Sequence, residues 1–130
     1  MGITVVWDNP EQTILRYIYN GQWNLDNFYI ALQESRDMMD TVNHRVGLII
    51  DVQNSKLVPN GVLSHGKNVA LRKHPNQGLS VIVGASGFVR TLFDVYKKVY
   101  RSSFDESGYA FTATLDDARN LLFKQPVASP

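Results

Sequence analysis

Ser64, His65 and Asp51 supply the residue types of a hydrolytic triad: a nucleophilic hydroxyl, a base that takes its proton, and a carboxylate that orients the base. Their spacing argues against that reaction. Ser64 and His65 are neighbours in a segment that we expect to be helical, so their side chains point about 100° apart and the imidazole is badly placed to take the proton. The sequence also lacks the Gly-x-Ser-x-Gly turn that presents a nucleophile above an α/β sheet. We therefore predict no catalytic residues and no enzymatic activity.

The three histidines do not suggest a metal site. His65 and His74 lie nine positions apart, which places them on opposite faces of a continuous helix, and His44 lies in a separate loop. No His-x-x-x-His pair supplies two ligands on one helix face, and the chain has no cysteine. We predict neither a bound metal nor a cofactor.

A glycine-rich turn before a predicted helix is a weak candidate for anion binding. The turn Gly84-Ala85-Ser86-Gly87 precedes this helix, and Arg90 lies one turn inside it. Free N–H groups and the helix dipole favour anions at such a position, so Gly84, Ser86, Gly87 and Arg90 are candidate ligands for a phosphate or nucleotide. The turn lacks both the phosphate-loop and the dinucleotide fingerprints. The alternative is that it only allows tight packing.

Length and charge narrow the class of protein. The 130 residues suit one domain, which we place at residues 1–124 with a loose tail at 125–130. The 13 basic and 12 acidic residues nearly cancel, which argues against nucleic acid as a partner. No apolar run approaches the roughly 20 residues needed to span a bilayer, and the first residues do not resemble a secretory signal. We expect a cytoplasmic protein without membrane insertion.

Hydrophobic periodicity predicts the element order β-β-α-β-α-β-α-β-α. The predicted strands are Ile3 to Trp7, Thr13 to Tyr19, Val46 to Val52, Leu79 to Val83 and Tyr109 to Thr112. The predicted helices are Asp26 to Val42, Asn60 to Lys73, Phe88 to Ser102 and Leu115 to Phe123. A hairpin followed by alternating helices and strands indicates an α/β fold, with a mixed sheet of about five strands and four helices. Ligands and partners usually meet the loops beyond the carboxyl ends of such parallel strands, which here are Gln53 to Asn60 and Gly84 to Gly87.

The order of these elements resembles the STAS domain of bacterial anti-sigma-factor antagonists. The likeness covers nearly the whole chain and includes the buried strand LIIDV (Leu48 to Val52), the helix start Pro59-Asn60-Gly61, the strand LSVIVG (Leu79 to Gly84), and the ending YAFTATLDDARNLL (Tyr109 to Leu122). The resemblance implies a signalling domain that docks a protein partner, such as a kinase-like anti-sigma factor. In that family a serine at this helix start is phosphorylated.

This sequence departs from the family at the helix start. Asn60 and Gly61 stand where the serine is expected, with Ser55 before and Ser64 after them. We therefore expect a divergent member that keeps the docking surface and lacks the phosphorylation switch at its usual place.

The expected docking surface lies on the second predicted helix and the loop before it. It combines apolar, hydrogen-bonding and basic side chains: Leu57, Val58, Asn60, Val62, Leu63, Ser64, His65 and Arg72. Lys67, Lys73 and His74 are expected beside it, and the alternative is an ordinary solvated helix face.

The predicted helix Phe88 to Ser102 suggests an alternative function. Its wide aromatic arc, formed by Phe88, Phe93, Tyr96 and Tyr100, is most simply part of the core. The margin of this arc is also suited to a second copy of the chain or to a lipid-like or nucleotide ligand. The alternative function is therefore a small-ligand carrier or sensor.

Overall fold

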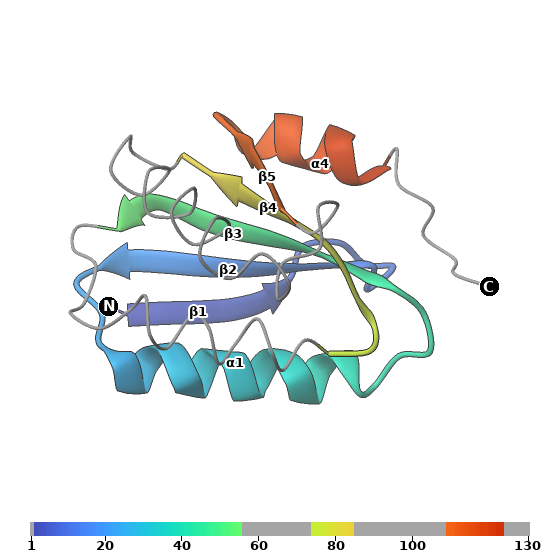
Figure 1. Ribbon diagram of the computed structural model, residues 1–130, viewed down its shortest axis with the longest axis horizontal. Helices are drawn as coiled ribbons and strands as arrows, with labels where there is room; N and C mark the ends of the chain where they lie inside the picture. Colours follow the sequence, from blue (N-terminus) through green and yellow to red (C-terminus); the bar gives the residue numbers. More distant parts are fainter. Residues whose placement is uncertain (1, 56–73, 85–108, 124–130) are drawn as a thin grey trace, which may run out of the picture.

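The computed structural model describes residues 2–55, 74–84 and 109–123, which form a five-stranded sheet and two helices (Figure 1). The strands are β1 (Gly2–Trp7), β2 (Ile14–Gly21), β3 (Val46–Ser55), β4 (Gln77–Val83) and β5 (Tyr109–Thr112), and the helices are α1 (Leu25–Met39) and α4 (Leu115–Phe123). The sheet order is β1-β2-β3-β4-β5. Strand β1 is antiparallel to β2, and the other neighbours are parallel. The predicted α/β mixed sheet is confirmed.

Some of the predictions concern residues that the structure does not describe. The predicted helices Asn60 to Lys73 and Phe88 to Ser102 lie outside the described residues, as does the tail 125–130.

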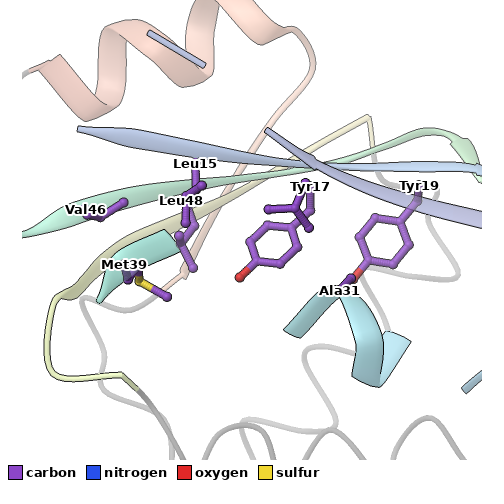
Figure 2. Close-up of a cluster of buried hydrophobic side chains, with 8 residues drawn as sticks. Leu15, Tyr17, Tyr19, Ala31, Met39, Val46 and Leu48 are labelled. Atoms are coloured by element: carbon purple, nitrogen blue, oxygen red, sulfur yellow. The ribbon is translucent and has the colours of Figure 1, made fainter. Parts of the chain in front are cut away.

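Alternating residues of β2 point to opposite faces of the sheet and so belong to two hydrophobic cores. Leu15, Tyr17 and Tyr19 pack with Ala31 and Met39 of α1, as Figure 2 shows. The second core includes the following residues on the other face: Ile14, Ile49, Val81, Val83, Ala118 and Leu122. Helices α1 and α4 therefore cover opposite faces.

Helix α4 approaches β3 closely at Gly47. A Cβ atom at Gly47 would lie 2.8 Å from Cδ2 of Leu122, so a larger residue there would require the Leu122 side chain to move. Thr114 caps the start of α4, because its hydroxyl accepts the Asp117 N–H at 3.1 Å.

Helix α1 begins as its sequence predicts and ends earlier. Asn24 and Asn27 form a reciprocal capping box, in which each side chain accepts the backbone N–H of the other residue. The helix ends at Met39 rather than Val42. The side chain of Asn76 donates to the carbonyls of Met39 at 3.0 Å and Val42 at 3.1 Å, and thereby ties the end of α1 and the residues that follow it to the turn before β4.

Strand β3 is longer than its apolar run predicts. Gln53 to Ser55, expected to begin a loop, continue the strand. They do so because β2 also continues: beyond an irregularity after Ile18, Asn20 pairs with Asn54 and Gly21 with Ser55. Gln53 and Asn54 are exposed, so no apolar pattern marks this extension.

Candidate functional site

Strands β2, β3, β4 and β5 finish at one end of the sheet, at Gly21, Ser55, Val83 and Thr112, and we call this end the carboxyl edge. Strands β3 and β4 are parallel neighbours, and Asp51 is level with Val83. The two segments with candidate binding residues therefore leave the sheet from adjacent strands. Gly84 is the one candidate residue within the described part. The others, Leu57, Val58, Asn60, Val62, Leu63, Ser64, His65, Arg72, Ser86, Gly87 and Arg90, lie outside the described residues.

Gly84 is a glycine for two local reasons. Its φ of +72° is in the left-handed region, and a Cβ atom there would collide with Cγ of Gln53. Its N–H donates to the carbonyl of Thr112 at 3.0 Å. The glycine thus ties β4 to β5 and lets Gln53 pack against the turn, and its amide is already engaged within the sheet.

A tryptophan supports the point where the chain leaves β3. Nε1 of Trp23 donates to Oγ of Ser55 at 2.8 Å, which joins the β2–α1 connection to the last residue of β3. Aromatic rings continue from Trp23 in both directions, to Tyr19 at 5.0 Å between centroids and to Phe28 at 6.0 Å. Tyr29 follows at 5.6 Å from Phe28. This connected set gives the carboxyl edge a fixed support beside Ser55.

Asp51 is buried on the α4 face of β3, with 4% of its surface exposed. Its Oδ2 accepts from Nη2 of Arg16 at 3.1 Å. Its Oδ1 accepts from the backbone N–H of Gln53 at 3.2 Å and from Nε2 of the same residue at 3.0 Å. Both carboxylate oxygens therefore already have partners, Arg16 in β2 and Gln53 in the same strand. Asp51 thus holds N–H groups of Gln53 and the guanidinium of Arg16.

The Asp51–Arg16 pair belongs to a longer ion network. Nη1 of Arg16 lies 3.9 Å from Oδ1 of Asp8. Asp8 in turn accepts two hydrogen bonds from Arg119 of α4, at 2.8 and 2.9 Å. These bonds raise the pKa of the Arg119 guanidinium above its ordinary value. The two buried carboxylates are matched by two guanidiniums, and the network joins the β1–β2 turn, the sheet and α4.

One group in this network has no partner among the described residues. Nε of Arg16 is buried and makes no hydrogen bond, although both carboxylates flank the same guanidinium. Apart from this Nε, the charged groups of the network are paired with one another, and the pairs hold the β1–β2 turn, the sheet and α4 together.

His74 is the one residue expected beside the docking surface that the structure describes, and it is buried. Its Nδ1 accepts the N–H of Asn76 at 3.0 Å, and its Nε2 lies 2.7 Å from Oδ1 of Asp40. Because Nδ1 accepts, the ring proton is on Nε2 and is donated to Asp40. His74 thus fixes the turn before β4 against the end of α1.

The ion network was missed because its members are far apart in the chain. Arg119 and Asp8 are separated by 111 positions, and Asp51 and Arg16 by 35. One sequence signal was present, since Arg16 and Asp51 are lone opposite charges within apolar strands. Such charges are rarely buried unless they are paired.

The described residues offer neither a metal site nor a membrane-spanning helix. No group of three histidine, aspartate or glutamate side chains there could hold a metal ion. Within residues 2–55, 74–84 and 109–123, no helix is both long and apolar enough to cross a membrane.

No protein-family model matches the chain, and no curated protein matches it. Function is therefore inferred from the residues and their geometry.

Proposed function

We propose that this protein is a non-enzymatic regulatory domain of STAS-like type, which docks a protein partner at the carboxyl edge of its sheet. The partner contacts the segment that follows Ser55. By the resemblance of the sequence, a kinase-like anti-sigma factor is the kind of partner that fits. The departure at Asn60 and Gly61 means that docking is not switched by a phosphoserine at the usual helix start.

The adjacency of β3 and β4 at the carboxyl edge carries this proposal. Ligands and partners of α/β sheets usually bind where loops leave the carboxyl ends of neighbouring parallel strands. Here the chain leaves β3 after Ser55, beside the Trp23 hydrogen bond, and leaves β4 at Gly84. The segments that leave at these points are those with the candidate binding residues.

The commitment of Asp51 supports a non-enzymatic role. A triad needs a carboxylate that is free to orient a histidine. Both oxygens of Asp51 are engaged, one by Arg16 and the other by Gln53. The acidic member of the one triad-like set in the sequence thus has a structural task.

Docking would bury Leu57, Val58, Val62 and Leu63, and replacement of Leu57 and Val62 tests the proposal. The double variant Leu57→Asp/Val62→Asp should lose co-purification with the partner from cells of the source organism, because each buried carboxylate would cost several kcal/mol. Its far-UV circular dichroism should remain that of the wild type. Mass spectrometry of the co-purified material identifies the protein that is lost.

A matched variant controls for the added charge. Val6 and Phe123 are also apolar, with 37% and 69% of their surfaces exposed, and lie away from the carboxyl edge. Val6→Asp/Phe123→Asp should retain the partner. Retention by Leu57→Asp/Val62→Asp, or equal loss from both variants, would show that the surface is wrong. A small mass retained in native mass spectra, with no protein partner, would favour the ligand carrier instead.

A further inference from the structure

The outward side of α1 carries an acidic line of residues with an apolar centre. Six side chains at intervals of three and four positions form this line, which we call the outer stripe: Asp26, Tyr29, Ile30, Gln33, Glu34 and Asp37. All six are exposed. The opposite side of the helix packs against the sheet through Ala31, Ser35 and Met39, and Figure 1 shows α1 running along the strands. The stripe extends over three turns and points away from the core.

The centre of the outer stripe is more apolar than helix stability requires. Ile30 is 60% exposed and Tyr29 is 37% exposed. An exposed helix position is best filled by alanine or a long unbranched residue, because β-branched and aromatic side chains lose rotamer freedom in a helix. Ile30 therefore weakens α1 slightly and packs little against its own chain.

The acidic residues of the outer stripe have no cationic partner among the described residues. Asp26, Glu34 and Asp37 form no ion pair there. Asp37 accepts a hydrogen bond from Gln33 at 2.9 Å. Asp26 lies at the helix start, where the dipole favours a carboxylate, but Asp37 lies near the helix end, where the dipole opposes one. The stability of α1 alone does not account for these charges.

We propose that the outer stripe is a second docking surface, and that its occupant is a basic amphipathic helix of a protein partner. Lysine or arginine side chains of that helix pair with Asp26, Glu34 and Asp37. An apolar side chain between them covers Ile30 and the edge of Tyr29. Side chains at intervals of three and four form ridges along a helix, and the ridges of another helix pack into the grooves between them. The outer stripe is separate from the carboxyl edge. This second proposal therefore does not depend on partner docking at the carboxyl edge.

Charge selects a basic occupant over a second copy of α1. Two acidic stripes would repel each other when they meet face to face, whereas a basic helix is attracted to all three carboxylates. A contact of this size belongs to the small, transient class of interface. We therefore expect micromolar affinity that weakens with added salt.

The test is a titration of the ¹⁵N-labelled full chain with a synthetic amphipathic helical peptide of lysine and leucine. The expected result is saturable chemical-shift change concentrated on residues 26–37. Ile30→Ala should weaken binding by about five- to tenfold, since it removes the apolar anchor. The same change improves helix propensity, so it does not harm folding. Glu34→Lys should weaken binding at least as much.

Glu11→Lys is the matched control. Glu11 is an exposed acid in the β1–β2 turn, so the change in net charge is the same as in Glu34→Lys and the affinity should stay near that of the wild type. Equal weakening by the two lysine variants, or no effect of Ile30→Ala, would mean that the peptide binds by general charge attraction, and the proposal would be wrong. It would also be wrong if no shifts occur, or if residues 26–37 shift with protein concentration alone, which would indicate a second copy.

Discussion

Arg16 is the residue on which the buried charges of the sheet converge. Its guanidinium lies between Asp8 and Asp51, whose side chains are almost completely buried. A buried ion pair adds little stability over an apolar pair of the same shape, but removal of one member leaves the other charge uncompensated. Single substitutions in the network should therefore lower the free energy of unfolding.

Asp51→Ala should lower the free energy of unfolding by roughly 2 to 3 kcal/mol, because Arg16 loses its closest carboxylate and Gln53 loses the oxygen that accepts two of its hydrogen bonds. Urea denaturation followed by circular dichroism measures this. Asp116→Ala is the control, since Asp116 lies 3.5 Å from Arg119 but its side chain is 90% exposed. Its cost should stay below about 1 kcal/mol. Similar costs for the two variants would mean that the network has no structural role.

Tyr17 gives the stability a dependence on alkaline pH. Burial raises the pKa of Tyr17 above its ordinary value of 10.0, although Ser35 and Arg36 partly oppose this. The unfolded chain therefore releases this proton first, and the stability linked to Tyr17 is complete below pH 10.0 and is lost as the pH rises through the folded pKa. In Tyr17→Phe, the unfolding free energy should fall less between about pH 9 and pH 11 than in the wild type.

Tyr29→Phe is the comparison for this pH dependence. Tyr29 is exposed, so its replacement should leave the wild-type pH dependence in place. If Tyr17→Phe also retains the full wild-type dependence, another group is responsible for the alkaline loss of stability.

At the scale of elements, α1 depends at its end on a residue from a distant turn. Asn76→Ala removes two hydrogen bonds, one to the carbonyl of Met39 at the end of α1 and one to that of Val42 just beyond it, and should lower the free energy of unfolding by roughly 1 to 3 kcal/mol. Hydrogen exchange of the last helical turn should accelerate in parallel. Asn43→Ala, at an exposed position near the same helix end, should cost no more than about 0.5 kcal/mol. Unchanged exchange in Asn76→Ala would show that α1 ends without this cap.

Local patterns predict elements where burial follows a regular period. The helices α1 and α4 and the apolar strands could be read from the sequence, because each depends on a pattern of residues a few positions apart. The last three residues of β3 could not be predicted in this way. They are polar and partly exposed, and their strand conformation depends on pairing with Asn20 and Gly21 of another strand.

At the scale of the molecule, the sheet order brings distant segments to one edge and one ion network. The mixed sheet could be predicted because a hairpin followed by alternating elements permits few arrangements. The pairs Arg119–Asp8 and Trp23–Ser55 could not be predicted. Their members are 111 and 32 positions apart, and charge and residue type do not show which distant residues come into contact. The sequence predicted which strand ends meet at the carboxyl edge, whereas the contacts that support this edge were visible only in the structure.

Photo-crosslinking in living cells tests the central claim, partner docking at the carboxyl edge, most directly. A photoreactive phenylalanine analogue is placed at Val62 in one variant and at the exposed Val6 in another. We predict a discrete protein adduct from Val62 and none from Val6. The account would be contradicted by an adduct from Val6 alone, or by the absence of a protein adduct from Val62.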